Sequence, residues 1–397
     1  MKILFVMPTL SGASGGPAQA VVQACRELKK QGVSVTIATT FLKDSSEAWE
    51  IGNSSGVEVI GFKRNIHTTF IEQFAFSFGL KKWLKGHIRD FDLVHIHYLF
   101  TFSSTIAGFY CHRYKVPYVL STDGMLSPFC LKQSAFKKKV YFSLFERNNL
   151  KNAAAIQFTS EQEMLSAQVS GMSNKYHVIP NGLKLKQFSG IDAQKGLFRM
   201  EYPACAGKKI VLFMGRIHPI KGLDILIPAL KQVFSRRKDF IFVLAGSGNK
   251  DYERRIRRLL TDAGLAGISI LTGFADERLK TKLLADSDIF VLSSYHENFG
   301  MAAAEALSCA MPVVISNKVD IHKLVEQYSC GIVTEMDPLK LSLALERLLS
   351  DDQLRYDMGT RGIQLVRENF DIGVIAKRMV QLYSNILSVK NQKRGVF

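Results

Sequence analysis

The chain has 397 residues, of which 47% are hydrophobic and 22% are charged. This length and composition are typical of a globular protein with room for two domains, and they exclude a disordered or fibrous chain. The balance is basic, with 52 Lys and Arg against 35 Asp and Glu, so nucleic acid, a membrane surface and anionic substrates are candidate partners. Because the sequence has no low-complexity or Arg-Gly-rich tract, nucleic acid is the least favoured of the three.

The N-terminal and cysteine patterns indicate a cytoplasmic protein. The six cysteines are scattered, with no Cys-x-x-Cys pair and no metal-ligand spacing, which favours reduced thiols. The first apolar run, MKILFVM, is too short for a signal peptide and predicts a strand. No stretch approaches the roughly 18 uninterrupted apolar residues of a membrane span.

The first half of the chain alternates predicted strands and helices. Residues 2–7 predict a strand, 11–17 a Gly-rich loop, and 17–31 an amphipathic helix that Gly32 ends. Further strands are predicted at 33–39, 93–97, 118–121, 155–158 and 177–179, and helices at 70–89, 103–113 and 133–152. Such alternation with short apolar strands predicts a parallel, doubly wound sheet.

The pattern restarts after the turn at 180–182, and 183–207 has no clear period. Strands are predicted at 209–214, 240–245, 269–271, 289–292, 313–316 and 332–334, and only helix follows from about 339. We therefore expect two Rossmann-like α/β domains that face a central cleft. Ligands of such sheets bind at the carboxyl ends of the strands, where the candidate loops lie.

The segment YHENFGMAAAEAL, residues 295–307, is the most informative in the chain. A helix beginning after Gly300 would place Glu305 in its second turn and leave Glu297 in the preceding loop. The amides around Asn298, Phe299 and Gly300 would then form an anion site beside two carboxylates that can accept sugar hydroxyls. A nucleotide sugar fits this arrangement; the alternative is two Glu residues that share no ligand.

Two loops offer phosphate contacts. After the strand 209–214, Arg216 provides a planar fork and Lys221 a point charge, unless this is an ordinary solvated loop. In the N-terminal loop, Gly15 and Gly16 could contact a donor phosphate, or the loop is only a tight turn. Its glycines lack the G-x-G-x-x-G spacing and no acidic residue ends the next strand, which argues against a nicotinamide cofactor.

Two weaker signals remain. Gly248 ends the segment LAGSG and is either part of a turn or a backbone contact to the ligand. His95 and His97 share one face of a strand but lack a third metal ligand at credible spacing, so a packed or cleft-edge role is favoured over a metal.

The motifs VIPNG, GRIHPIKG, LAGSG and ENFGMAAAEAL, in this order, resemble glycosyltransferase family 4, whose members are retaining enzymes of the GT-B architecture. The resemblance covers nearly the whole chain. It implies domains of residues 1–185 on the acceptor side, joined by a terminal helix at about 373–397, and 186–372 on the donor side. It also implies metal-free catalysis without a cofactor, in keeping with the absence of a DxD motif near the candidate loops.

The resemblance assigns roles to the candidate residues. Glu297 contacts the transferred sugar, Glu305 the ribose, Arg216 and Lys221 the diphosphate, and the loop with Gly15 and Gly16 a donor phosphate. The chain departs from the family at Asp123, where many relatives carry a His that approaches the sugar. Asp123 could accept a sugar hydroxyl, accompany a different sugar or weaker catalysis, or only cap a turn.

The resulting hypothesis is retaining transfer from a nucleoside-diphosphate sugar to a glycan or lipid-linked acceptor in cell-surface polysaccharide synthesis. The alternatives are a GT-B nucleotide-sugar epimerase and a non-catalytic nucleotide-sugar-binding subunit. Residues 80–89 and 132–151, which combine cations with Phe, Tyr and Trp, further predict peripheral binding to the anionic inner face of the plasma membrane. In the alternative interpretation, they are solvated faces over core aromatics.

Overall fold

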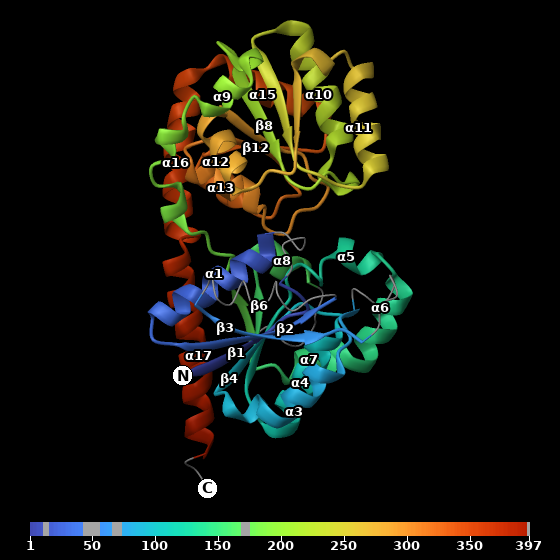
Figure 1. Cartoon of the computed structure of the whole chain (residues 1–397), viewed down its shortest axis with the longest axis vertical. Coiled ribbons are helices and arrows are strands. Elements are labelled where there is room, and N and C mark those ends of the chain that lie inside the picture. The colour runs from blue at the N-terminus through green and yellow to red at the C-terminus, as the bar shows by residue number, and fades with distance from the viewer. Residues whose placement is uncertain (11–15, 43–55, 66–73, 168–174, 395–397) are drawn as a thin grey trace. The chain divides into compact units, whose positions relative to one another are not determined.

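The computed structural model describes residues 1–10, 16–42, 56–65, 74–167 and 175–394. The chain divides into two compact units, drawn in Figure 1: unit 1 is Met1–Gly182 with Ile372–Phe397, and unit 2 is Leu183–Asp371. Each unit has one parallel β-sheet with helices on both faces. The predicted class, two doubly wound α/β domains, is therefore confirmed.

The sheet of unit 1 has, within the described residues, the strand order β3-β2-β1-β4-β5-β6-β7. The strands are β1 (Lys2–Val6), β2 (Ser34–Phe41), β3 (Glu58–Lys63), β4 (Leu93–His97), β5 (Tyr118–Ser121), β6 (Ala155–Phe158) and β7 (Tyr176–Val178). The sequence analysis missed β3, because this edge strand reads EVIGFK and its apolar residues are interrupted by Gly61 and bounded by charges. The order reverses between β1 and β4, which is where open α/β sheets bind ligands.

Two hydrophobic cores cover the faces of this sheet. On one face α1 (Gly16–Lys30) packs against α17 (Ile372–Arg394), and Leu28 and Tyr383 are fully buried there. On the other face lie α3 (Phe78–His87), α4 (Phe102–Tyr114) and α7 (Arg147–Asn152). The terminal helix therefore belongs to unit 1 although unit 2 precedes it in the chain.

The predicted helices of unit 1 differ from the observed ones in detail. Of the helix predicted at 70–89, residues 70–73 lie outside the described residues, and residues 74–77 are not part of the helix. The helix α3 begins at Phe78, where Ser77 accepts a hydrogen bond from the Leu80 amide as its N-cap. The helix predicted at 133–152 is built of α6 (Ala135–Tyr141), a π-helical turn (Phe142–Glu146) and α7. Two short helices, α5 (Pro128–Lys132) and α8 (Glu161–Ser166), flank it in the chain.

The sheet of unit 2 has the order β10-β9-β8-β11-β12-β13 among the described residues. Its strands are β8 (Lys209–Met214), β9 (Phe240–Ala245), β10 (Ser269–Gly273), β11 (Ile289–Leu292), β12 (Val313–Ser316) and β13 (Gly331–Thr334). The central strands β8, β9, β11 and β12 read as nearly continuous apolar runs, as strands covered on both faces do. The order reverses between β8 and β11, so the loops after these strands flank the expected ligand position.

Helices enclose this sheet. They are α10 (Leu223–Arg236), α11 (Lys250–Asp262), α12 (Glu277–Asp286), α13 (Met301–Ser308), α14 (His322–Gln327), α15 (Pro338–Ser350) and α16 (Asp352–Asn369). The segment without periodicity, 183–207, contains short 3₁₀ turns and α9 (Leu197–Glu201). Asp286 fixes it by accepting the amides of Phe198 at 2.8 Å and Arg199 at 3.1 Å.

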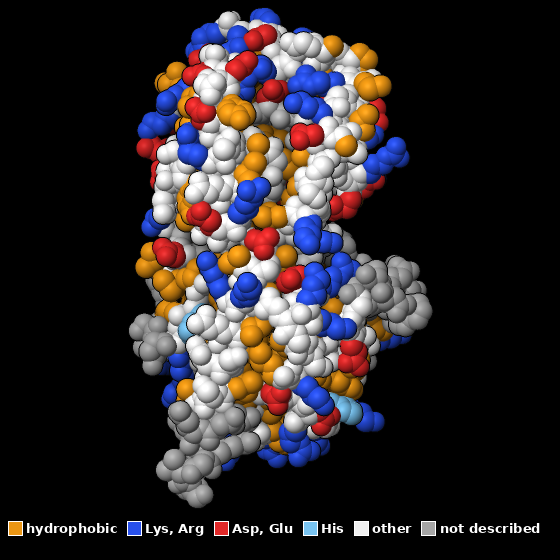
Figure 2. Space-filling model, turned by 90° about the vertical axis from the view of Figure 1, so that its left-hand side faces the viewer, with side chains coloured by type: hydrophobic (Ala, Val, Ile, Leu, Met, Phe, Trp, Pro, Cys, Tyr) orange, Lys and Arg blue, Asp and Glu red, His pale blue; other side chains and the backbone are white. Residues whose placement is uncertain are grey.

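The positive charge is unevenly divided. Unit 1 carries 25 Lys and Arg against 12 Asp and Glu, whereas unit 2 carries 27 against 23. The part of unit 2 in the upper half of Figure 2 accordingly shows acidic and basic side chains interspersed. Among the helices of the described residues, none is both long and apolar enough for a membrane span.

Candidate functional site: the carboxyl edge of the sheet in unit 2

The site is built around Lys221 and Glu297, which follow the two strands at the reversal point. The Lys221 ammonium forms an ion pair with the Glu297 carboxylate, and both side chains are mostly buried, at 15% and 21% exposure. Arg216 lies on the same loop as Lys221, directly after β8, and is exposed. The structure therefore brings three of the predicted catalytic side chains to one edge of one sheet.

The loop that carries Lys221 is held against the loop after β11. Gly222, at φ +65°, is the N-cap residue of α10, and a Cβ on it would lie 1.8 Å from the carbonyl oxygen of Ser293. The Ser293 hydroxyl donates to the Gly222 carbonyl at 2.9 Å, and the Tyr295 amide donates to the carbonyl of Ile220 at 2.8 Å. A glycine is needed at position 222 because the two backbones touch there, which also sets the place of Lys221.

Glu297 is held from its other side by the loop after β12. Its amide donates to the carbonyl of Lys318, and its carbonyl accepts the amide of Asp320, both at 3.0 Å. The sequence analysis did not identify residues 317–320 as part of the site. Paired backbone contacts of this kind have no signature in side-chain type, so no signal in the sequence could have found them.

The helix predicted after Gly300 is present as α13, and Gly300 at φ +84° stands at its N-cap position. Glu297 lies in the loop before it, and Glu305 lies in its second turn, as predicted. The first amides of α13 have no acceptor within the helix, so this end carries partial positive charge next to Glu297. Phe299 is buried against Phe370 and thus anchors the loop.

Glu305 has a partner that the sequence analysis missed. Its carboxylate lies 2.9 Å from the ammonium of Lys280 on α12, which also pairs with Glu277 at 2.9 Å. Burial raises the pKa of Glu305, and the nearby Lys280 opposes that shift only in part. Burial by itself would lower the pKa of Lys280, but the two carboxylates outweigh it and the pKa is raised. The two ion pairs of Lys280 thus join Glu305 to α12.

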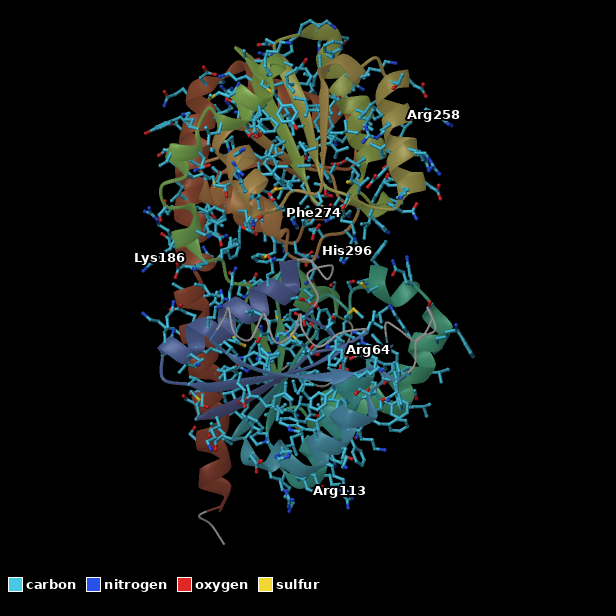
Figure 3. The ribbon with its side chains drawn as sticks, viewed as in Figure 1. Arg64, Arg113, Lys186, Arg258, Phe274 and His296 are labelled. Atoms are coloured by element: carbon cyan, nitrogen blue, oxygen red, sulfur yellow. The ribbon has the colours of Figure 1, made fainter. Side chains whose placement is uncertain are left out.

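The two histidines at this edge have lowered pKa values. Burial, and next Arg216 and Lys221, lower the pKa of His218. Burial also lowers the pKa of His296, where Glu297 opposes the shift and Lys221, to a smaller extent, adds to it. His296 and Phe274 are labelled at this edge of the sheet in Figure 3. Because both imidazoles lose their proton more readily than a free histidine, Arg216 and Lys221 are the principal cations here for an anion.

Gly248 follows β9 at the same edge. Its amide donates to the Glu253 carboxylate, and a Cβ at this position would lie 1.9 Å from the carbonyl oxygen of Ile217. These contacts explain the glycine by close packing of two loops. Its predicted contact with the donor stays a prediction.

The remaining candidates belong to unit 1. Gly15 lies outside the described residues, and Gly16 is the first residue of α1. Asp123 follows β5 at φ +47°, and its carboxylate accepts from His97 Nδ1 at 3.0 Å, the Tyr98 amide at 3.2 Å and the Ser121 hydroxyl at 3.3 Å. The carboxylate is thus tied to the loop after β4, at the reversal point of this sheet.

The two strand histidines are core residues. The rings of His95 and His97 stack with centroids 4.5 Å apart, and His95 Nδ1 lies 2.6 Å from the hydroxyl of Tyr383 on α17. Burial, and next the proximity of His97, lower the pKa of His95 well below its usual value. The predicted packed role is confirmed for His95, which is fully buried. The described residues contain no cluster of three or more His, Cys, Asp and Glu able to hold a metal.

Glu163 on α8 is a further residue that sequence reasoning did not find. Its buried carboxylate accepts the Gly124 amide at 2.6 Å and the Thr159 amide at 2.8 Å. Burial raises its pKa, and these hydrogen bonds oppose the shift. Glu163 therefore holds the turn that carries Asp123.

Comparison with known proteins identifies the fold and the family. Residues 197–365 match the family model "Glycosyl transferases group 1", and residues 15–182 match "Glycosyl transferase 4-like domain". The chain belongs to the group 1 glycosyltransferases. Both matches fall within the units that the structure separates, one in each.

Relatives and solved structures agree with this. The chain is 23% identical over 400 residues to the D-inositol 3-phosphate glycosyltransferase of Corynebacterium glutamicum (strain R), covering 96% of this chain and 94% of that protein. The GDP-mannose:cellobiosyl-diphosphopolyprenol alpha-mannosyltransferase of Xanthomonas campestris is 23% identical over 347 residues, covering 86% of this chain and 85% of that protein. The crystal structure of Anabaena Alr3699/HepE in complex with UDP and glucose matches with a TM-score of 0.79 at 20% identity, over 97% of this chain and all of that one. The fold is therefore GT-B, and the chain is a glycosyltransferase.

Proposed function

We propose that this glycosyltransferase moves a sugar from a nucleoside diphosphate to a hydroxyl of a glycan or lipid-linked saccharide, with retention at the anomeric carbon. The observation that carries the proposal is the Lys221–Glu297 ion pair beside the N-terminus of α13, with Arg216 on the same loop as Lys221. One carboxylate for sugar hydroxyls and two cations for a diphosphate thus stand at one sheet edge.

In the proposed step the bond between the anomeric carbon and the diphosphate oxygen breaks, and a bond to the acceptor oxygen forms on the same face of the sugar. The acceptor's proton passes to the departing diphosphate. Arg216, Lys221 and the first amides of α13 stabilise the charge that develops on that leaving group. They would replace a metal ion in this role, and Glu305 would hold the ribose hydroxyls.

Two of the similar proteins support the choice of substrates. Anabaena Alr3699/HepE has been crystallised with UDP-glucose, and the Xanthomonas relative is named for transfer to a diphosphopolyprenol-linked sugar. By analogy with these substrates, we propose for this protein a nucleotide-sugar donor and a lipid-linked or glycan acceptor in cell-surface polysaccharide synthesis. The protein would work in the cytoplasm, peripherally at the inner face of the plasma membrane, with nucleic acid playing no part.

The test is turnover of a panel of nucleotide sugars, with and without cell-envelope extract and with and without EDTA. Release of nucleoside diphosphate that depends on the extract, and that survives EDTA, is the expected result. Conversion of the donor sugar without extract or release of diphosphate would instead indicate a nucleotide-sugar epimerase. Binding without any turnover would indicate a non-catalytic subunit, and activity lost in EDTA and restored by a divalent ion would refute the metal-free step.

A further inference from the structure

A continuous apolar ridge runs along the outside of the helical segment 135–147 in unit 1. Phe136 is 80% exposed and Leu144 is 65% exposed, with Val140 at 44% between them and Phe145 at 43% beside them. In an α-helix, side chains four residues apart share a face. The π-helical turn Phe142–Glu146 has a wider repeat, which keeps Leu144 in line with Val140 and turns Glu146 inward, where it is fully buried.

Exposed cations flank this ridge. Lys137, Lys139 and Arg147 are exposed on the same segment. From residue 93 to residue 160 the chain has eight Lys and Arg but two acidic residues, Asp123 and Glu146, and the side chains of both are at most 8% exposed. The segment therefore presents exposed apolar side chains flanked by exposed positive charge.

The other stretch proposed from the sequence has a different structure. Trp83 on α3 is half-buried, with its ring 5.7 Å from that of Phe62 and 6.2 Å from that of Phe91. Its lysines, Lys81 and Lys82, are exposed, but the aromatic residue expected as an anchor belongs to the core. The structure therefore does not support Trp83 as an aromatic anchor for the membrane contact predicted at residues 80–89.

We propose that the ridge of Phe136, Val140, Leu144 and Phe145 inserts into an anionic lipid bilayer, while Lys137, Lys139 and Arg147 contact the headgroups. Apolar anchors at the boundary of acyl chains and headgroups combined with flanking cations are the general requirements for a helix lying in a membrane interface. The charge argues for lipid over a second copy of this chain, because two such surfaces would repel each other. That the surface delivers a lipid-linked acceptor rests on the proposed function; the membrane contact itself does not.

The same segment contacts the loop after β4 in unit 1. Lys138, half-buried, donates to the carbonyl of Cys130 and lies 5.6 Å from the ring of Phe100, and Glu146 accepts the Phe100 amide at 2.6 Å. Phe100 lies in the loop after β4 that also contacts Asp123 through Tyr98. A bilayer at the ridge would thus border the loops at the reversal point of this sheet.

The experiment is co-sedimentation of the full chain with phosphatidylcholine vesicles whose phosphatidylglycerol content is varied from none to about 40%. Wild type is expected to bind in proportion to anionic lipid and to be released by salt. The double variant Lys137→Glu, Lys139→Glu should lose about tenfold or more of its partitioning, whereas Lys81→Glu, Lys82→Glu, with the same charge change on α3, should lose much less.

The apolar contribution has its own matched pair. Leu144→Ser should weaken binding several-fold, whereas Leu165→Ser on α8, equally exposed at 65%, should not. The proposal would be overturned if, in each pair, the control variant lost as much membrane binding as the test variant. Membrane binding that does not depend on lipid charge would also overturn it. Calorimetric titration of each variant with UDP separates this outcome from a failure of the donor site. A variant that loses membrane binding but still binds UDP is affected at the ridge alone.

Discussion

The Lys221 ammonium and the Glu297 carboxylate, 76 residues apart in the chain, form an ion pair at the carboxyl edge of the sheet in unit 2. Each follows a strand at the point where the sheet order reverses. Without ligand each group neutralises the other. In a complex, a diphosphate could bind the Lys221 ammonium while a sugar hydroxyl donates a hydrogen bond to the Glu297 carboxylate.

Replacement of Glu297 by Ala should lower turnover on the order of 100-fold or more, because a contact made to the transferred sugar in the transition state is lost. Calorimetry should show UDP binding nearly unchanged or tighter, since Lys221 is released from its pair. Glu297→Gln, which keeps an acceptor oxygen but not the charge, is the control. A folded Ala variant with near wild-type turnover would remove Glu297 from the site.

Replacement of Arg216 or Lys221 by Ala should weaken binding of a nucleoside diphosphate by about 1.5–3 kcal/mol and leave binding of the nucleoside nearly unchanged. The reason is that each variant loses one charge-assisted contact to phosphate. Lys231→Ala, on the helix that follows the same loop, provides a control for loss of charge alone. Equal losses for nucleoside and diphosphate would contradict the assignment.

Replacement of Glu305 by Ala should weaken nucleoside and nucleoside diphosphate alike, because its proposed partner is the ribose. Lys280→Met should act in the same direction, since it removes the ammonium that opposes the raised pKa of Glu305. Titration of each variant with both ligands measures this. If Glu305→Ala affected only the diphosphate, the ribose role would be wrong.

Two variants of Asp123 separate a catalytic carboxylate from a loop cap. Asn tolerates the φ of +47° and can accept the Tyr98 amide, so Asp123→Asn should unfold at nearly the wild-type temperature. Asp123→Ala should be less stable by about 1–3 kcal/mol, because buried hydrogen bonds are lost. If the Asp123 carboxylate is catalytic, both variants should lose turnover. Full turnover in Asp123→Asn would mean that Asp123 only caps the loop.

Glu146 should make the stability of unit 1 depend on pH. Burial raises its pKa from 4.5 to about 7, partly opposed by hydrogen bonds from the Phe100 amide and Asn149. A raised pKa means that its contribution to the free energy of unfolding is fully present below about pH 4.5 and is lost as the pH rises through about 7. Glu146→Gln keeps an acceptor for Phe100 without the charge.

The melting temperature of Glu146→Gln relative to wild type should therefore rise between pH 5 and pH 8, by the equivalent of at most about 3 kcal/mol. Glu161→Gln, on the exposed end of α8, should show no such trend. A difference between Glu146→Gln and wild type that is constant over this range would mean that Glu146 does not titrate there.

Local sequence patterns predicted the two-domain α/β class and most of the strands. Short apolar runs such as 209–214 and 289–292, separated by helical patterns, are compatible with few other folds. The sequence also placed Glu297 before and Glu305 within the helix that begins after Gly300, because MAAAEAL forms helix strongly and the glycine breaks it. These conclusions depend on neighbours in the chain, which the sequence displays directly.

The partners of these residues depend on tertiary packing. Lys280 meets Glu305, loop 317–320 holds Glu297, and Glu163 supports the turn of Asp123, and each contact joins segments that are distant in sequence. Likewise the exposure of Phe136 and the burial of Trp83, both aromatic residues in basic stretches, differ because neighbouring elements cover one ring and not the other. Periodicity reports which face of an element is apolar, but packing against the rest of the unit decides which apolar face stays in solvent.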